Sequence, residues 1–315
     1  MIKYKNIVHF THHDLDALGC MLHLDIATPN SKKTHFHTNY LNMQEKVSDV
    51  YDYCYLNKPD LLIISDISFS TNKNELYKLQ EILDICPIIF IDHHEYEENF
   101  FDDIRIPYFH DITKSATKIT QEVFKTKGKN KNLDALSDII NSFDIWLQNE
   151  SNFKVSMALN DYFWTVNEKL SLENMMFRFK ENDYKPPNFK TFFEKYNADF
   201  KQKYESFKKR KLITSDGFFA VCFVDEYFNE ILYEEFTKGV EFVFIANSYG
   251  ITRFRFNSFG KLTRPQKEEI KLKLIGTLNI GHLNAFSDKI QNSNFDKIMN
   301  KVKEVHNILE QYKGK

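Results

Sequence analysis

Glycine is scarce in this chain, with only 9 residues among 315. Because glycine tolerates backbone conformations and close approaches that other residues do not, we expect each one to have a local reason. Cysteine is rarer still. The 4 thiols are widely spaced and form no C-x-x-C pair, which argues against disulfides and a structural zinc site; they are Cys20, Cys54, Cys86 and Cys222. We expect free core thiols in a protein of a reducing compartment.

A long apolar run and an excess of one charge are also absent. No run approaches the roughly 18 apolar residues that a membrane-spanning helix needs. The polar start of the chain is followed by an apolar stretch that His12 and His13 interrupt at once, so we expect no signal peptide and predict a cytoplasmic protein. The net charge of -2 excludes a surface that binds nucleic acid everywhere, while a local basic groove stays compatible with it.

Short apolar runs, in contrast, recur along the first half. Residues 6–10, 61–65 and 88–91 are apolar almost throughout, which is typical of strands buried on both faces of a parallel sheet. Helical spacing lies between them, as over 73–85, and later over 115–124, with Ser115 as its N-cap. Strand and helix in alternation predict an α/β fold class.

The length predicts two domains at about 150 residues each. The texture changes near Lys185, where Pro186-Pro187 cannot continue a helix. We predict three segments, which are a first domain over 1–185, a helical linker over 186–212 and a smaller α/β domain over 213–315. The linker includes a basic stretch over 201–211, which we interpret as a solvated helix face. Strand-like segments follow at 218–224, 241–246 and 251–256.

Metal-ligand residue types follow the first predicted strand. His12, Asp14 and Asp16 are two residues apart, and such residues share a face of an extended chain, so we expect their side chains to point the same way. His13 would point to the opposite face and is not an expected ligand. Two carboxylates and an imidazole suit a divalent cation of the Mn²⁺ type, and without one their repulsion would be costly.

The other two predicted strands end in the same kind of residue. The run 61–65 leads into Asp66, the run 88–91 leads into Asp92-His93-His94, and Asp144 follows a predicted helix over 133–142. Strand ends in a parallel sheet meet at one edge, where ligands bind. A single aspartate after a strand is commonly a turn or cap residue. Three strands that all end this way indicate one shared site.

Taken in order, these residues resemble motifs I to IV of the DHH phosphoesterases. The chain is most similar to the nanoRNase B type of oligoribonuclease, and the likeness is clearer before residue 165 than after it. The segments that carry the resemblance are His12-x-Asp14-Leu15-Asp16, Asp66, Ile91-Asp92-His93-His94, Ser115-Ala116-Thr117, Phe143-Asp144-x-Trp146 and Leu159-Asn160-Asp161.

The resemblance implies two metal ions, usually Mn²⁺, in the first domain. Asp66 would bridge them. His12 and Asp14 would complete one site, and Asp16, His93 and Asp144 would complete the other. Many family members carry the first histidine at the position of Phe10, so His12 is assigned in its place. Mg²⁺ and Co²⁺ stay open as alternatives, although imidazole ligands disfavour Mg²⁺.

The family resemblance also gives roles to the residues around the metal. His94 would face the substrate phosphate or the leaving group, and Asp92 would orient the histidine pair. Near neutral pH, a metal-activated water would attack phosphorus, while the metals and His94 stabilise the developing charge.

A second domain of the DHHA1 type would hold the substrate. Its glycine-rich loop cradles phosphate on backbone N–H groups. The counterpart here is 278–285, where Gly281 and His282 remain but most glycines of the pattern are replaced. Arg253 and Arg255 share one face of a predicted strand and could bind phosphate. The family pattern favours Arg255, and a solvated strand face is the alternative.

These features predict a two-metal phosphoesterase that hydrolyses short single-stranded RNA to nucleoside monophosphates. We expect no membrane and no long duplex as partner, and the oligomeric state stays open, a dimer included. One alternative is hydrolysis of 3′-phosphoadenosine phosphate, linear dinucleotides or polyphosphate. Another is a nucleotide- or RNA-binding protein that has lost catalysis. Most of the 30 Phe and 16 Tyr must be core, and the sequence does not identify those that stack on bases.

Overall fold

A computed structural model describes residues 4–39, 41–70, 72–209, 213–223, 233, 235–236, 238–247, 250–257, 260–276, 285–290 and 294–313. The chain divides into two compact units, Met1–Phe193 and Glu194–Lys315. The division falls inside helix α8, Phe189–Lys209. The segment predicted as a linker, 186–212, therefore contains this whole helix.

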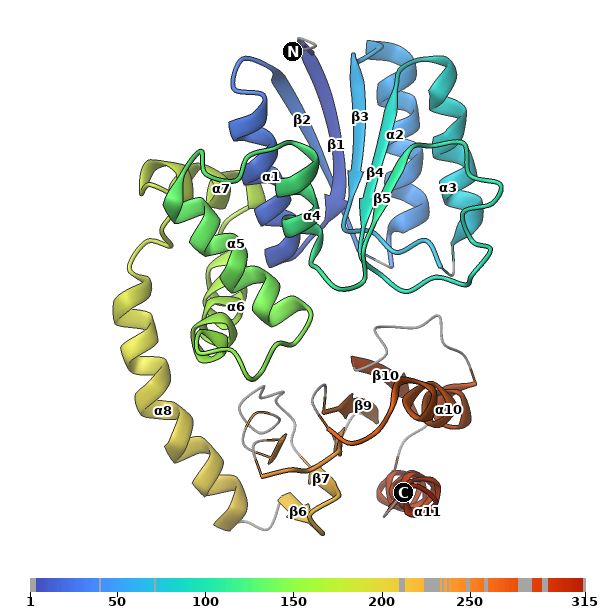
Figure 1. The fold of residues 1–315 in the computed structure, drawn as a ribbon, viewed down its shortest axis with the longest axis vertical. Helices are drawn as coiled ribbons and strands as arrows, with labels where there is room; N and C mark the ends of the chain where they lie inside the picture. Colours follow the sequence, from blue (N-terminus) through green and yellow to red (C-terminus); the bar gives the residue numbers. More distant parts are fainter. Residues whose placement is uncertain are drawn as a thin grey trace. The chain divides into compact units, whose positions relative to one another are not determined.

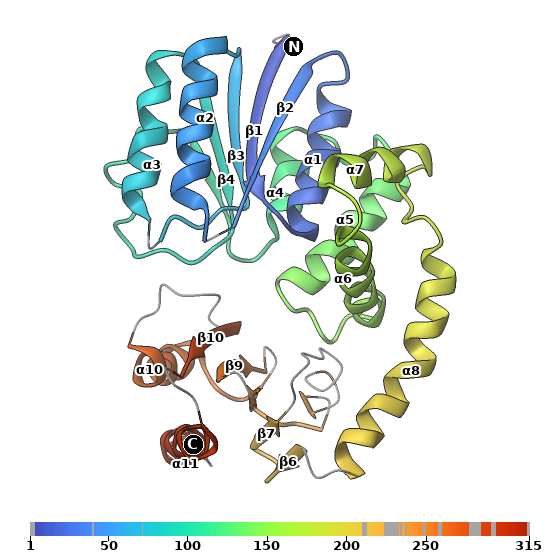
Figure 2. The same ribbon diagram turned by 180° about the vertical axis from the view of Figure 1, so that it is seen from behind.

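The first unit is built on a five-stranded parallel sheet with the strand order β2-β1-β3-β4-β5 (Figures 1 and 2). The strands are β1 Asn6–His12, β2 Lys32–Thr38, β3 Leu61–Ser65, β4 Ile88–Asp92 and β5 Tyr108–His110. β3 lies in the middle and is buried at every position, which explains its continuous apolar run. The order places the carboxyl ends of β1, β3 and β4 side by side.

Side chains alternate between the two faces of this sheet. Val8 and Phe10 join the core beneath α2 (Met43–Asn57) and α3 (Lys73–Gln80). Ile7 joins the core on the opposite face, with residues of α1 (Leu15–Ala27) and α4 (Ala116–Val123). Figure 1 shows these two helix layers on the two sides of the sheet. Both faces of the central strands are therefore covered by helices, as their apolar sequences predict.

Three more helices complete the first unit beside α1. They are α5 Lys131–Asp144, α6 Phe153–Asn167 and α7 Leu172–Glu181. With α1 they form a separate apolar core that includes Leu18, Ile140 and Phe163. Both views show α5 and α6 near the carboxyl ends of the strands (Figures 1 and 2). This position brings Asp144, the last residue of α5, to the strand ends.

The second unit contains a mixed sheet with the order β10-β9-β8-β7-β6, in which only β7 and β8 pair in parallel among the described strands. Its elements are β6 Ile213–Ser215, β7 Phe219–Phe223, β8 Phe242–Ala246, β9 Ile251–Phe256, α10 Arg264–Ile275, β10 Ala285–Lys289 and α11 Phe295–Glu310. Phenylalanines such as Phe242, Phe254 and Phe286 fill its core. The predicted α/β class with a parallel sheet in the first part is confirmed.

Most predicted elements lie within a few residues of the observed ones. The strands predicted over 61–65 and 251–256 match in full. The helix predicted over 73–85 is shorter, because α3 ends at Gln80 and a 3₁₀ turn, Glu81–Asp84, follows it. Among the residues that the structure describes, no helix is both long and apolar enough to cross a membrane.

Candidate metal centre

The strand ends bring most of the predicted ligands together. Three groups at these strand ends each have their ligand atoms within 4.8 Å of one another, and they are His12, Asp14 and Asp66; Asp16, His93 and Asp144; and Asp66, Asp92, His93 and His94. Asp66 and His93 each belong to two groups. This overlap follows from the sheet, because Asp66 comes directly after β3 and His93 comes directly after its neighbour β4.

The segment from His12 to Asp16 is not extended, and the predicted alternation of its side chains is wrong. β1 ends at His12 and α1 begins at Leu15. Asp14 is the N-cap of α1: its Oδ1 accepts a hydrogen bond from the Ala17 N–H at 3.0 Å, and its Oδ2 lies 2.7 Å from His12 Nδ1. Aspartate favours this capping position. The start of the helix therefore directs Asp14 and Asp16 into different groups.

Asp16 is fixed by the N-terminus of another helix. Its carboxylate accepts hydrogen bonds from the N–H groups of Ala116 (2.7 Å) and Thr117 (2.9 Å), and the Thr117 hydroxyl donates to the Asp16 carbonyl at 2.9 Å. A helix N-terminus attracts negative charge. Gly19 permits this approach, since a Cβ at this position would overlap Thr117 Oγ1. The close approach of Thr117 is the local reason for this glycine, as we expected from the scarcity of glycine in the chain.

Asp66 leaves β3 in a strained conformation. Its φ of 55° lies in the left-handed region, which costs a residue with a Cβ about 1–2 kcal/mol. Its N–H donates to the Ile91 carbonyl at 3.0 Å, and its side chain is only 3% exposed. The buried Oδ2 atom receives no hydrogen bond from the described residues. An unpaired buried carboxylate oxygen is costly and marks a place for positive charge.

His93 faces three carboxylates with one ring nitrogen. Its Nε2 lies 3.3 Å from Asp144 Oδ2, 3.4 Å from Asp66 Oδ1 and 3.9 Å from Asp16 Oδ2. The side chains of His93 and Asp16 are each 1% exposed, so water screens this pair little, whereas that of Asp144 is 21% exposed. A single imidazole ring therefore faces three acidic side chains.

Burial and mutual repulsion raise the pKa of three carboxyl groups. Burial is the largest cause for Asp66, and Asp14 and Asp16 raise its pKa further, well above the ordinary value. Burial, then Asp16, also raises the pKa of Asp144, and burial raises that of Asp16 against the effect of His93. Asp14 differs, because His12 lowers its pKa although burial opposes this. The centre therefore holds carboxylates that ionise with difficulty unless a cation is near.

The donor set fits divalent cations. Carboxylate oxygens together with imidazole nitrogens suit Mn²⁺. A cation would relieve the repulsion among the carboxylates and give Asp66 Oδ2 a partner. The assignment of individual ligands to individual ions stays a prediction.

Asp92 orients His94. Its Oδ1 lies 2.8 Å from His94 Nδ1, and its Oδ2 accepts a hydrogen bond from the Tyr96 hydroxyl. His110 Nε2 also lies 2.6 Å from the His94 carbonyl. Burial opposes ionisation of Asp92, yet His94 lowers its pKa. Tyr96 and His110 were not predicted as site residues, because they stand in a polar, aromatic segment without a periodic pattern.

The second unit carries the remaining predicted residues. β9 alternates as predicted, with Arg253 and Arg255 half-buried on one face and Phe254 buried on the other. Arg255 Nη1 donates to the carbonyls of Phe254 at 2.9 Å and Phe286 at 3.2 Å. Gly281 and His282 lie outside the described residues. A phosphate-binding role for these four residues stays a prediction.

A row of polar side chains on the α1-facing side of the sheet was not predicted. His9 Nε2 lies 2.8 Å from Ser65 Oγ, which also bonds with Thr11 Oγ1 at 3.0 Å. His9 Nδ1 lies 3.2 Å from His35 Nδ1 on β2. Burial, and then the neighbouring histidines, lowers the pKa of His9 and brings the pKa of His35 to about 4. Both rings are therefore neutral at pH 7.

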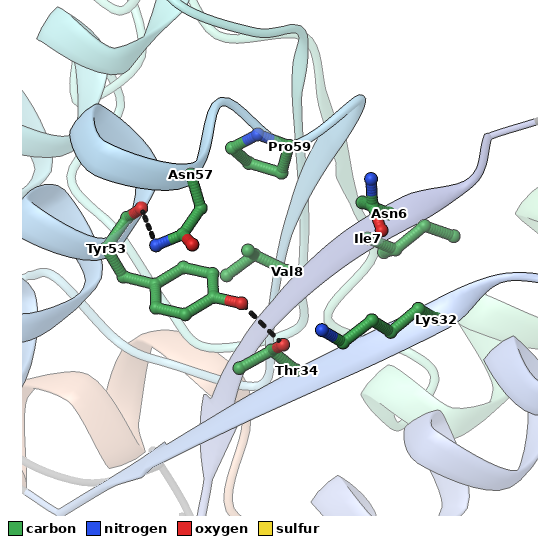
Figure 3. A pocket seen from close by; sticks show the side chains of 8 residues that line it. All are labelled: Asn6, Ile7, Val8, Lys32, Thr34, Tyr53, Asn57 and Pro59. Atoms are coloured by element: carbon green, nitrogen blue, oxygen red, sulfur yellow. Dashed lines mark hydrogen bonds between the residues drawn. The ribbon is translucent and has the colours of Figure 1, made fainter.

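A small cavity of about 170 Å³ lies at the opposite end of β1 (Figure 3). The Tyr53 hydroxyl and Thr34 Oγ1 share a hydrogen bond of 3.0 Å across it. Its lining residues are Asn6, Ile7, Val8, Lys32, Thr34, Tyr53, Asn57 and Pro59. Ligands of parallel α/β sheets bind at the carboxyl ends of the strands. This cavity is at the amino ends, so it does not extend the candidate centre.

Comparison with known proteins finds similarity only in structure. No family model and no curated protein sequence matches the chain. It is similar to RecJ from Thermus thermophilus in complex with Mn²⁺, with a TM-score of 0.60, 13% identity, 98% of this chain covered and 52% of that chain. The same organism's RecJ in complex with Mg²⁺ gives a TM-score of 0.52, 11% identity, 98% and 50% coverage.

A further similar structure is exonuclease RecJ bound to manganese, with a TM-score of 0.55, 14% identity and coverage of 98% of this chain and 90% of that chain. The chain spans about half the length of the T. thermophilus chains. Because the identities are this low, the comparison establishes the fold alone, and the nanoRNase B type stays a prediction. The chain therefore has a fold similar to that of RecJ.

Proposed function

We propose that this protein is a metal-dependent phosphoesterase that hydrolyses short oligoribonucleotides to nucleoside monophosphates. The observation that carries the proposal is the set of three overlapping groups of carboxylates and histidines that share Asp66 or His93, with the ligand atoms of each group within 4.8 Å of one another. Its place at the strand ends of a RecJ-like fold supports the same chemistry. RecJ structures hold Mn²⁺ or Mg²⁺, and one is described as an exonuclease.

The side chains proposed to hold two Mn²⁺ ions are His12, Asp14, Asp16, Asp66, His93 and Asp144. When bound, the ions would supply a hydroxide nucleophile near neutral pH and neutralise charge on the phosphate. Burial of Asp16, Asp66 and His93 limits access of water to these three side chains and strengthens the electrostatic interactions among them. Asp66, which belongs to two of the groups, is the residue proposed to serve both ions.

Asp92 and His94 would act on the substrate side. A carboxylate next to Nδ1 favours the tautomer with its proton on that nitrogen. Nε2 is then the atom of His94 that accepts or donates a proton at the phosphate or the leaving oxygen. Arg255, Arg253, Gly281 and His282 are the proposed phosphate contacts of the second unit, with short single-stranded RNA as the partner.

The test is incubation of the full chain and Mn²⁺ with an end-labelled RNA of five nucleotides. We expect stepwise shortening and release of nucleoside monophosphates. Asp66→Ala should abolish turnover and weaken Mn²⁺ binding measured by calorimetry. Asp84→Ala is the matched control, because Asp84 is exposed and lies outside the three ligand groups. An Asp66→Ala protein that binds Mn²⁺ and turns over RNA like wild type would overturn the proposal.

A substrate panel separates the alternatives. Hydrolysis of 3′-phosphoadenosine phosphate, a linear dinucleotide or polyphosphate without cleavage of the RNA would replace the oligoribonuclease activity with a small-substrate activity. Nucleotide binding without turnover of any substrate would indicate a binding protein that has lost catalysis. Parallel reactions with Mg²⁺ and Co²⁺ identify the metal that supports activity.

A further inference from the structure

Trp164 is a large aromatic side chain that α6 leaves on the surface. It is 45% exposed, whereas the preceding residue, Phe163, is fully buried in the core. The two rings meet edge to face with centroids 5.2 Å apart, so Phe163 holds one side of the indole. The exposed part of the side chain is accessible to a ligand.

His13 connects Trp164 to the candidate metal centre. The His13 ring lies 6.5 Å from Trp164, and it also lies 6.1 Å from the ring of His37 at the carboxyl end of β2. His13 follows His12 directly, so their Cα atoms are about 3.8 Å apart. The three rings therefore stand at the strand-end edge that carries the carboxylates. His37 is itself anchored, because its Nε2 lies 2.9 Å from Glu173 Oε1.

The charges around Trp164 favour a neutral group over a phosphate. Asp161 lies three residues before Trp164 in α6, and Glu168, the C-cap of this helix, lies four residues after it. Glu173 adds a third carboxylate beside His37. A phosphate would be repelled here, whereas a nucleobase is uncharged and presents a π-face to an aromatic ring.

We propose that Trp164, with His13 beside it, is a stacking surface for the base of the nucleotide whose phosphate lies at the metal centre. The inference rests on the proposed function and adds a subsite to it. Stacking accepts any base, because every base has a π-face. The subsite therefore gives affinity for nucleosides without selecting a sequence, and it makes Trp164 a positioning residue for the scissile phosphate.

The test compares binding of adenosine 5′-monophosphate and ribose 5-phosphate, which differ only in the base. Affinities are measured by calorimetry with Mn²⁺ present, so no turnover is needed. We expect wild type to prefer the nucleotide. Trp164→Ala should weaken nucleotide binding by roughly ten-fold or more and leave ribose 5-phosphate unchanged. Trp164→Phe should keep most of the preference. Tyr55→Ala, at a site 63% exposed on α2, is the control and should change neither affinity.

Three results would overturn the stacking surface. The first is equal affinity of wild type for the two ligands, and the second is a Trp164→Ala protein that keeps the preference. In both cases RNA hydrolysis by wild type shows that the proposed function still stands. The third is no binding of either ligand together with no hydrolysis of RNA, which overturns the proposed function as well. Circular dichroism of each variant confirms that the fold is retained.

Discussion

Asp66 is held in an unfavourable state that destabilises the fold and supports the candidate metal centre. Its left-handed φ of 55°, its burial and its unpaired Oδ2 each cost stability, and none of the three contributes to packing. A residue held in such a state by its surroundings commonly serves a functional site. The raised pKa of Asp66 has the same origin in burial and in the carboxylates next to it.

Asp66→Asn keeps the shape of this residue and removes its charge. We expect the thermal stabilisation that Mn²⁺ gives to wild type to fall strongly, because a ligand that binds the folded state more weakly stabilises it less. Activity should fall by more than the 10- to 100-fold that is typical for residues that merely orient ligands. The measurements are melting temperature with Mn²⁺ or EDTA and turnover of the five-nucleotide RNA. Asp84→Asn should match wild type in both, and an equal Mn²⁺ shift in Asp66→Asn would contradict the prediction.

Tyr96 acts one step further out, through Asp92. Tyr96→Phe removes the hydroxyl that donates to Asp92 Oδ2 while it retains the ring packing against Phe100 and Phe101. We expect kcat to fall by about 10- to 100-fold with little change in KM, because His94 loses orientation and the substrate contacts stay. Steady-state kinetics check this split.

Tyr77→Phe is the matched control for Tyr96→Phe. Tyr77 also donates to a carboxylate, that of Asp103, but this pair is exposed. Its kinetics should equal those of wild type. A fall in stability with unchanged kcat in Tyr96→Phe would mean that the hydroxyl has only a structural role.

At the scale of elements, the site depends on how closely α1 approaches α4. Gly19→Ala would place a methyl group against Thr117, so the helices must separate and the hydrogen bonds to Asp16 must lengthen. We expect a loss of about 1–3 kcal/mol in the free energy of unfolding, as for other overpacked cores, together with weaker Mn²⁺ binding. Urea denaturation and calorimetry measure the two effects.

Gly128→Ala separates this effect from the loss of any glycine. Gly128 has a φ of 82°, but no atom of the described residues lies within 4 Å of the position that a Cβ would take. The variant should lose stability through backbone strain and keep full Mn²⁺ affinity. If Gly19→Ala also kept full affinity, the close approach would matter for packing alone.

The elements that the sequence predicted well are the ones whose surroundings are uniform. β3 and β4 are apolar up to their last residue because both faces are covered, so the sequence pattern alone identifies them as strands. β2 was not predicted, since KKTHFHT is half-buried, polar and located at the sheet edge. The histidines at alternate positions of this segment were a sequence feature that could have indicated the strand.

Some contacts in the site could be predicted from the nearby sequence, whereas others depend on residues far away along the chain. Strand ends predicted that Asp66 and His93 would meet, because parallel order alone brings them together. The partners of Asp16 could not be predicted, as Ala116 and Thr117 are about a hundred residues away and meet it only through the packing of α1 on α4. Likewise, the start of a helix at Leu15 depends on the cap formed by Asp14, and this overrode the alternation expected for an extended chain.

At the scale of the whole molecule, each unit has its own apolar core, so the stability of the centre is a property of the first unit. Both tryptophans, Trp146 and Trp164, belong to that unit. Tryptophan fluorescence therefore reports unfolding of the part that carries the metal ligands. This probe allows the effect of charge in the centre on the stability of the first unit to be measured in the full chain.

The pH dependence of stability contains opposing contributions. Raised pKa values, as for Asp66, give stability that is full below the ordinary value of 3.8 and is lost as pH rises through the folded pKa. Lowered histidine pKa values act oppositely: burial lowers the pKa of His23 to about 3, so its contribution is full above the ordinary 6.5 and is lost as pH falls. Between these two pH values the terms partly cancel in wild type.

The difference in stability between Asp66→Asn and wild type isolates the contribution of the Asp66 carboxylate. Without metal, we expect Asp66→Asn to gain stability over wild type as pH rises above about 4, by up to about 1.4 kcal/mol per pH unit, because only wild type must ionise a buried carboxyl. The contributions of histidines away from the centre, such as His23, are common to both proteins and cancel. Urea denaturation in EDTA, followed by tryptophan fluorescence from about pH 4.5 to 8, measures the difference. With Mn²⁺ the order should reverse, since the ion stabilises the ionised Asp66. A difference that stays constant across this range would show that Asp66 ionises in the folded protein as easily as in water.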